Sequence, residues 1–334
     1  MCVMAGKLIL GIDIGATKIR IGLGDVEGNI YVKRVHKTAD AATDIVGFII
    51  NDIKSNFSRE LKEILGIGIA SIGPLDLRKG VILSPPNAPF KNVKIVDSLK
   101  EEFNVDVFLI NDAVAAVWAE KLYGAGRNFR NLVYVTLSTG IGVGAIVDGN
   151  LLIGKDGNAH EAGHIVIDSS GMMRCRCGGY GHWEAYCSGI NIPFFIKRVI
   201  DEKYKEEVKR SSLYDDYSKG LITPERLYEL ARQGDELALK LTEDELGRLN
   251  AAGIASVINC YDPEIVLLGG SIALNNKDLV LKPIAKHIDK YITNRRPIIE
   301  LTSLGEDVVL KGALAVIANT PRTLIEYLQA ILSS

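Results

Sequence analysis

Residues 131–154, NLVYVTLSTGIGVGAIVDGNLLIG, contain an apolar run, a Ser-Thr-Gly turn, a second apolar run and a tight Asp-Gly-Asn turn. Residues 7–37 follow the same plan, in which KLILGIDI leads through GATK into a second apolar run and turns at 27–29 (EGN) into a third. Apolar runs of this length, bounded by glycine and small polar residues, are typical of buried strands. The two segments share little identity, but the shared plan indicates an internal duplication and two similar lobes with a cleft between them.

The segments around these two stretches alternate between strands and helices. Apolar residues recur with helical spacing over 41–64, where Ile45, Phe48, Ile49 and Ile53 share one face. A polar and charged segment at 200–220 is expected to be a surface excursion. Further strands are expected at 66–71, 105–110 and 264–270, and further helices at 94–103, 112–124, 235–262 and, as a pair, 313–333. Strands followed by helices in this order predict an α/β fold.

Composition limits the classes of protein to which the chain can belong. Its 334 residues suggest two domains, and 47% hydrophobic with 24% charged residues fits an ordinary soluble globular protein. The net charge is −2, no basic stripe points to nucleic acid, and no apolar stretch approaches a membrane span. The N-terminal run MCVMAGKLILGI leads directly into DIGAT, so we expect a strand there rather than a signal peptide, and a cytoplasmic setting. The five cysteines are an odd number, and the clustering of three of them, at 175, 177 and 187, favours a metal site over disulfides.

The stretch 160–184, HEAGHIVIDSSGMMRCRCGGYGHWE, gathers three of the five histidines and two of the five cysteines. Its pattern H-x10-C-x-C-x4-H places nitrogen and sulfur donors on a glycine-rich loop, and zinc prefers such donors in a tetrahedral arrangement. Close spacing lowers the entropic cost of collecting them. The competing interpretation is a loop with unrelated thiols. We favour a structural metal that holds the flanking carboxylates Glu161 and Glu184, together with His164, in a binding site.

Two turns of small residues could hold phosphates. In 13–18 (DIGATK), small residues let backbone N–H groups approach a phosphate, Thr17 and Lys18 add a hydroxyl and a charge, and Asp13 could hold magnesium. In 138–144 (STGIGVG), alternating glycines leave room for a ligand. Each turn alone could equally be a structural hairpin. Together they suggest one nucleotide held from both sides of a cleft.

Three further positions have a functional and a structural interpretation. Gly269 and Gly270 end a buried strand, where the missing Cβ suits a flat ring or a ribose, although many strand–helix connections end this way. Asn111 and Asp112 begin a helix, so they are natural N-caps, but a carboxylate there could also accept a hydroxyl proton during phosphoryl transfer. Asn87, in SPPNAPF, could present a planar amide to hydroxyl groups or simply favour a turn.

Taken together and in this order, these motifs resemble the ROK family (repressors, open reading frames and kinases), whose enzymes are ATP-dependent sugar kinases of the actin-like ATPase (ribonuclease H-like) fold. The resemblance runs from DIGATKIR to LLGGSIA and is most specific at STGIGVGAIVDGNLLIG, EAGH and CRCGGYGHWE. The family's last motif is C-x-C-G-x-x-G-C-x-E, so His182 stands here in place of its third cysteine. Ala16 also replaces a glycine that many members have.

The resemblance implies a role for each matched position. It implies contacts with the hexose from Gly73, Asn87, Asn111, Asp112, Glu161, His164 and Glu184. Among these, Asp112 would be the catalytic base that takes the proton from the 6-hydroxyl. It implies contacts with phosphates and magnesium from Asp13, Gly15, Thr17, Lys18, Thr139 and Gly140, and with adenosine from Gly269 and Gly270. It implies a structural zinc site with ligands His164, Cys175, Cys177 and His182, for which Cys187 is an alternative fourth ligand; histidine also ligates zinc.

The function implied by the resemblance is that of an ATP-dependent hexokinase of glucokinase type, a transferase of glycolysis that phosphorylates glucose or a broader range of hexoses. An N-acetylmannosamine or N-acetylglucosamine kinase is the alternative among kinases. A non-catalytic sugar sensor is the alternative from another class, but the presence of Asp13, Thr17 and Asp112 together argues against it. The family's repressors carry a helix-turn-helix domain ahead of the first phosphate motif. Because Asp13 follows only twelve residues, DNA binding is not expected.

The resemblance also implies how the chain is organised. We expect a small α/β lobe of residues 1–115 with a C-terminal helical tail of about 313–334, and a large α/β lobe of 116–312 that carries the metal-binding loop. Family members are usually dimers or larger, so we expect a homo-oligomer, either a dimer or a tetramer.

Overall fold

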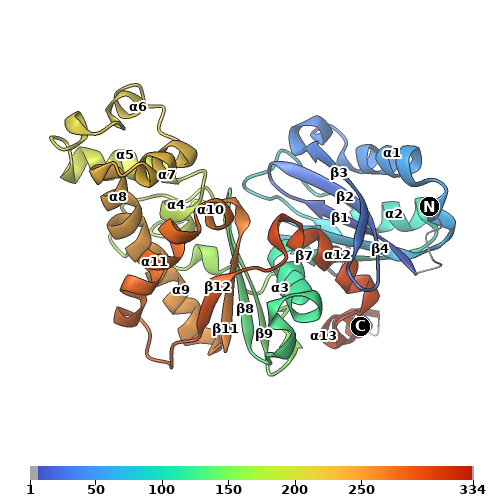
Figure 1. Cartoon of the computed structure of the whole chain (residues 1–334). Helices are drawn as coiled ribbons and strands as arrows, with labels where there is room; N and C mark the ends of the chain where they lie inside the picture. Colours follow the sequence, from blue (N-terminus) through green and yellow to red (C-terminus); the bar gives the residue numbers. More distant parts are fainter. Residues whose placement is uncertain (1–6, 333–334) are drawn as a thin grey trace. The chain divides into compact units, whose positions relative to one another are not determined.

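The computed structural model describes residues 7–332 (Figure 1). Contacts divide the chain into two compact units: unit 1 comprises Met1–Tyr134, Gly144–His160 and Thr302–Ser334, and unit 2 comprises Val135–Val143 and Glu161–Leu301. The lobe limits expected from the sequence stay a prediction. Residues 1–6, the first half of the run for which we expect a strand and no signal peptide, lie outside the described residues.

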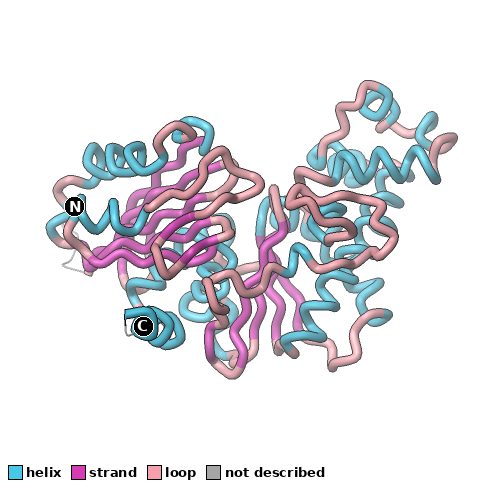
Figure 2. Tube along the Cα trace, turned by 180° about the vertical axis from the view of Figure 1, so that it is seen from behind, coloured by secondary structure: helices cyan, strands magenta, loops and turns pink. Residues whose placement is uncertain are grey.

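Five strands form the sheet of unit 1 in the order β3-β2-β1-β4-β7 (Figure 2). β1 (Leu8–Ile14) pairs antiparallel with β2 (Lys18–Asp25), and β2 pairs antiparallel with β3 (Ile30–Lys37). On its other side β1 pairs parallel with β4 (Ile64–Ser71), which pairs parallel with β7 (Asp106–Asn111). Strands were predicted at these positions from the apolar runs of the sequence, and the prediction is confirmed. The carboxyl ends of β1, β4 and β7 therefore meet at one edge of the sheet.

Helices α3 (Asp112–Tyr123) and α12 (Val308–Ala318) pack against each other and against this sheet. The close approach depends on glycine, because a Cβ at Gly68 would overlap the backbone carbonyl of Ala313. Since α12 comes from the far end of the chain, the tail completes the core of unit 1. The first helix of the predicted C-terminal pair is therefore confirmed, and it begins earlier than expected.

Helix α1 (Ile45–Phe57) and helix α2 (Ile95–Phe103) lie on the other side of the sheet of unit 1 (Figure 1). The helix predicted over 41–64 is shorter than expected at both ends. Asp44 caps its start by accepting a hydrogen bond of 2.9 Å from the backbone N–H of Gly47. Unit 1 also contains two short strands and one further helix: β5 (Leu75–Asp76), β6 (Val81–Ile82) and α13 (Arg322–Leu332).

A second five-stranded sheet has the order β10-β9-β8-β11-β12. It consists of β8 (Leu132–Leu137), β9 (Ile141–Val147), β10 (Asn150–Leu151), β11 (Ile265–Gly269) and β12 (Ile298–Leu301). The helices of unit 2 are α4 (Trp183–Cys187), α5 (Ile192–Lys203), α6 (Tyr214–Ser218), α7 (Pro224–Arg232), α8 (Glu236–Lys240), α9 (Gly247–Tyr261), α10 (Gly270–Asn275) and α11 (Lys277–His287).

The single long helix expected over 235–262 is interrupted. Between α8 and α9, residues Leu241–Leu246 form a π-helical segment, which inserts an extra residue into the turn. The apolar spacing on either side stays helical, so the sequence pattern does not reveal the change.

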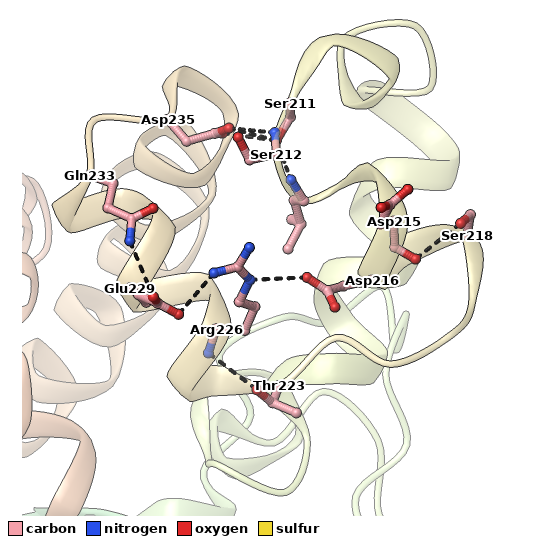
Figure 3. A network of polar contacts seen from close by, with 11 residues as sticks. Ser211, Ser212, Asp215, Asp216, Ser218, Thr223, Arg226, Glu229, Gln233 and Asp235 are labelled. Carbon is pink, nitrogen blue, oxygen red and sulfur yellow. Dashed lines mark hydrogen bonds and ion pairs between the residues drawn. The ribbon is translucent and has the colours of Figure 1, made fainter.

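The polar segment expected as a surface excursion contains α6, and a hydrogen-bonded network joins it to α7 (Figure 3). Arg226 on α7 pairs with Asp216 on α6 at 3.2 Å and with Glu229 at 2.9 Å. The hydroxyl of Ser211 donates to Asp235, which in turn caps α8. These are exposed or half-buried pairs that order the excursion and contribute modestly to stability.

Within residues 7–332 no single helix is long and apolar enough to span a membrane. Helices Gly305–Ala318 and Arg322–Ala330 reach that length and hydropathy only as a pair, and the pair is bent by 65°.

Candidate functional site

In unit 1, Asp13 lies one residue before the carboxyl end of β1 and is almost fully buried. The antiparallel register places it opposite Arg20 on β2, whose guanidinium Nη1 lies 2.6 Å from the Asp13 carboxylate. Burial raises the pKa of Asp13, and the charge and hydrogen bond of Arg20 oppose that rise. The carboxylate is therefore held by a cation on its own hairpin.

The turn that follows β1 is held by one hydrogen bond within the turn and by one from Thr38. The Gly15 N–H donates to the Lys18 carbonyl at 2.9 Å, and the Thr38 hydroxyl donates to the Gly15 carbonyl at 2.8 Å. Thr17 and Lys18 are exposed beside it. The backbone of the turn is thus fixed from two sides, while the hydroxyl and ammonium groups of the motif reach the surface.

Asn111 and Asp112 stand where β7 ends and α3 begins. The Asn111 side-chain oxygen accepts hydrogen bonds from the N–H groups of Ala113 and Val114 at 3.0 and 3.2 Å, so the N-cap interpretation is correct for this residue. One carboxylate oxygen of Asp112 accepts from the Ala113 N–H at 2.8 Å. Because a carboxylate offers about four acceptor positions, this contact orients Asp112 without exhausting its capacity to bind a hydroxyl.

Strand pairing brings these groups of unit 1 to one edge. In register, Ile14 on β1 stands beside Ser71 on β4, and Ser71 stands beside Asn111 on β7. Two strand spacings of about 4.8 Å separate β1 from β7, so Asp13 and Asp112 occupy the same sheet edge at a distance suited to different parts of one ligand. Ligands of open α/β sheets bind beyond the carboxyl ends of the strands.

The segment after β4 carries Gly73 and Asn87. It is anchored by Asn158, whose side chain binds both the N–H and the carbonyl of Leu75 at 2.7 Å. The side-chain oxygen of Asn87 is buried and has no hydrogen-bond partner. A buried acceptor without a partner costs free energy unless a ligand satisfies it, which favours the binding interpretation of Asn87 over a purely structural turn.

In unit 2, the four ligands that the family motif implies gather around one point. The donor atoms of His164, Cys175, Cys177 and His182 all lie within 4.8 Å of one another. Nδ1 of His164 is 3.7 Å from the sulfur of Cys175, and Nδ1 of His182 is 3.3 Å from the sulfur of Cys177. Zinc–sulfur and zinc–nitrogen bonds at tetrahedral angles place neighbouring donors roughly 3.3–3.8 Å apart. The cluster therefore fits a tetrahedral zinc ion.

The chemistry of the donors agrees with this geometry. Burial raises the pKa of Cys175 to about 12, so the thiol needs a cation to become a thiolate at neutral pH. Burial and the neighbouring His164 lower the pKa of His182, which keeps its imidazole neutral and able to ligate. All four cysteines among residues 7–332 are free thiols, and Cys187 is buried beside the carbonyl of Leu246. His182, rather than Cys187, completes the group.

The carboxylates that flank the cluster are held in different ways. Nε2 of His164 lies 3.7 Å from Glu161, so the two ring nitrogens of His164 face the cluster and this carboxylate respectively. Glu184 on α4 is buried, and one of its oxygens accepts a 2.9 Å hydrogen bond from the backbone N–H of Ile141. A second carboxylate oxygen lies 3.9 Å from the Cys175 sulfur. Glu184 thus lies beside both the Cys/His cluster and the start of β9.

The two glycine-containing turns of unit 2 meet each other. The hydroxyls of Ser138 and Ser271 are 3.2 Å apart. Gly270 has a φ of 84°, and a Cβ there would overlap the carbonyl of Leu137, so glycine is required for this approach. The structure therefore brings Thr139 and Gly140 close to the Gly269-Gly270 turn, as one nucleotide-binding surface would require.

Three residues on which the site depends were not assigned a function from the sequence. Arg20 could have been found from the hairpin register, which pairs it with Asp13. The contact of Ile141 with Glu184 spans 43 residues and leaves no local signal. Asn191 binds the backbone carbonyl of Glu184 and is almost fully buried, and it too lacks a recognisable motif.

The chain is similar over nearly its whole length to known sugar kinases. A model of the ROK family matches residues 9–320. Glucokinase from Pyrobaculum calidifontis is 39% identical over 323 residues, which cover 95% of this chain and 97% of that protein. Glucokinase from Aeropyrum pernix is 35% identical over 321 residues, with coverage of 95% and 98%.

A solved structure agrees with these relatives. The crystal structure of a ROK family glucokinase from Streptomyces griseus, in complex with glucose and AMPPNP, has a TM-score of 0.78 and 31% identity, and it covers 95% of this chain and 99% of that one. The expected fold class, the actin-like ATPase fold, is confirmed by this likeness.

Proposed function

This chain belongs to the ROK family, and on that premise we propose that it is an ATP-dependent hexokinase that transfers the γ-phosphoryl group to the 6-hydroxyl of glucose. The observation that carries this proposal is the common sheet edge of Asp13 and Asp112 in unit 1. One carboxylate stands beside the phosphate turn and the other beside the segment that carries Asn87. Phosphoryl transfer needs a base near the attacking hydroxyl and charge compensation near the phosphates.

Asp112 is the proposed general base. Its contact with the Ala113 N–H at the start of α3 fixes the carboxylate, so it can accept the proton of the 6-hydroxyl as that oxygen attacks phosphorus. Magnesium bound with ATP would neutralise charge on the phosphates. Asp13 would bind it, directly or through water, while Thr17 and Lys18 contact phosphate oxygens and Gly15 shapes the turn that presents them.

The proposed hexose contacts are those that the family resemblance implies. From unit 1, Asn87 offers a buried acceptor to a sugar hydroxyl. From unit 2, Glu161, His164 and Glu184 offer directional acceptors and donors. Thr139 and Gly140 would contact phosphates, and Gly269 and Gly270 would leave room for adenosine. Asn111 contributes chiefly by capping α3 and orienting Asp112.

We also propose that the Cys/His cluster binds a structural zinc ion. A metal there would fix the loop that carries Glu161 and Glu184, and it would orient His164 through the ring nitrogen that does not face Glu161. The tetrahedral spacing of the donors supports this assignment. The metal has no direct role in the phosphoryl transfer.

Initial rates on a panel of sugars test the function. We expect magnesium-ATP to release ADP with glucose at higher kcat/KM than with mannose, fructose, N-acetylmannosamine or N-acetylglucosamine. A preference for an N-acetyl sugar would reassign the enzyme as an N-acetylhexosamine kinase. No sugar-dependent ADP release with any hexose would indicate a non-catalytic sensor. We further propose a cytoplasmic homo-oligomer, dimeric or tetrameric, that acts at the entry of glucose into glycolysis; light scattering would measure its size.

A further inference from the structure

The short helix α4 (Trp183–Cys187) joins three parts of the proposed site in unit 2. His182, a ligand of the Cys/His cluster, is its N-cap residue. Glu184, a proposed hexose contact, lies in its first turn. The segment Ser188–Ile190, which follows the helix, runs beside the turn 138–141.

Three hydrogen bonds connect α4 and the residues that follow it with the turn 138–141. The Ile141 N–H donates to the Glu184 carboxylate at 2.9 Å. The Gly189 N–H donates to the Ser138 carbonyl at 2.7 Å, and the Ile190 N–H donates to the Thr139 carbonyl at 3.3 Å. The backbone of the proposed phosphate turn is therefore shaped by the same residues that carry a hexose contact.

Asn191 closes the end of α4. Its side-chain amide donates to the backbone carbonyl of Glu184 at 3.0 Å and to the Ser188 hydroxyl at 2.9 Å. Asn191, Ser188 and Glu184 are all nearly or fully buried. A five-residue helix cannot satisfy its own terminal carbonyls, so the amide of Asn191 sets the direction in which the chain leaves α4 and reaches the turn.

We propose that Asn191 is a positioning residue for both substrates of the proposed kinase. It holds Ser188–Ile190 against the turn 138–141, and it thereby fixes Thr139 for the nucleotide and Glu184 for the hexose. This inference rests on the proposed function. The chain from His182 to Asn191 is one hydrogen-bonded segment. Asn191 therefore also connects the Cys/His cluster with the turn 138–141.

The test compares Asn191→Asp with a matched control. Aspartate has the same shape but cannot donate to the Glu184 carbonyl. The control is Asn250→Ala, because Asn250 is also buried and also binds α4, by accepting a 2.9 Å hydrogen bond from the Trp183 indole, but makes no contact with the turn 138–141. If Asn191→Asp does not fold, Asn191→Ala takes its place.

We expect the Asn191 variant to raise the dissociation constants of both AMPPNP and glucose by roughly tenfold, with zinc content unchanged, while Asn250→Ala changes them less than about twofold. Hydrogen exchange of the peptide that covers 136–143 should become faster in the Asn191 variant alone.

Equal effects of both variants on affinity and exchange, or no effect of the Asn191 variant on exchange, would overturn the proposal. If the wild-type chain phosphorylates no hexose, the proposed function fails, while the exchange comparison still decides the role of Asn191.

Discussion

The guanidinium of Arg20 lies 2.6 Å from the carboxylate of Asp13, across one rung of the β1–β2 hairpin. The pair is largely buried. Asp13 is the proposed magnesium-binding carboxylate, so its side chain must remain charged. The pKa of Asp13 is nevertheless raised, because burial outweighs the attraction of Arg20. The ionised form of Asp13 thus depends on Arg20 more than an exposed carboxylate would.

Replacement of Arg20 should therefore destabilise the protein in a pH-dependent way. A raised pKa means that the folded state binds its proton more tightly than the unfolded chain, so Asp13 contributes less stability as pH rises above its ordinary pKa toward the raised value. Arg20→Gln should lower the free energy of unfolding by about 3 kcal/mol at neutral pH and by less at acidic pH. Urea unfolding at several pH values measures this change in the free energy of unfolding. In the pH profile of kcat, the acidic limb of the variant should lie at higher pH than that of the wild type.

The matched control is the exposed pair of Lys54 and Glu102, which is 2.5 Å long. The lysine side chain is about half exposed and the glutamate about one-third, so Lys54→Gln should cost less than about 1 kcal/mol. A loss of stability in Arg20→Gln that is equally small and independent of pH would show that the Asp13 carboxylate does not need its partner.

Asp112→Asn should abolish most turnover and leave the fold intact. Asparagine keeps the side-chain oxygen that accepts from the Ala113 N–H, but it cannot take a proton from the sugar. General-base catalysis contributes about 10²–10⁴-fold, so kcat should fall by that factor while glucose still binds. Asp97→Asn, in the first turn of α2, changes a comparable acidic residue and should leave kcat unaltered. Wild-type kcat in Asp112→Asn would remove the base assignment.

Asn87→Ala should weaken glucose binding with little loss of stability. The side-chain oxygen is buried without a partner, so its removal breaks no hydrogen bond of the protein. KM for glucose should rise by about tenfold, as expected for one lost hydrogen bond to a ligand. Asn158→Ala is the contrasting variant, because Asn158 makes two hydrogen bonds with Leu75 and its loss should lower Tm. A large fall in Tm of Asn87→Ala with unchanged KM would favour a structural turn residue.

The purified protein should contain one zinc ion per chain, which metal analysis can measure. His182→Ala should lose it, because three donors hold a structural zinc ion poorly. His182→Cys, which restores the family's cysteine, should retain the zinc ion. His36→Ala should leave the zinc content unchanged, because His36 lies in unit 1 and the Cys/His cluster lies in unit 2. Full zinc occupancy in His182→Ala would exclude His182 from the ligand set.

The strands of unit 1 could be predicted because their information is local. Apolar alternation, glycine turns and small polar residues placed β1, β2 and β3, and the same reasoning put Asn111 and Asp112 at the start of a helix. The interrupted helix at Leu241–Leu246 could not be predicted, since an extra residue in one turn leaves the apolar spacing on both sides helical.

Ligand candidates were also readable, because zinc donors and phosphate turns need particular residue types at short spacing. The sequence by itself thus determined the strands of the first hairpins, and it brought forward the Cys/His group and the two carboxylates as candidates that stay predictions. Only the tertiary structure decided that Ile141 binds Glu184 and that Asn191 fixes the end of α4. The physical reason is that a local pattern reports which face of an element is buried, whereas a hydrogen bond across 43 residues depends on how those faces pack together.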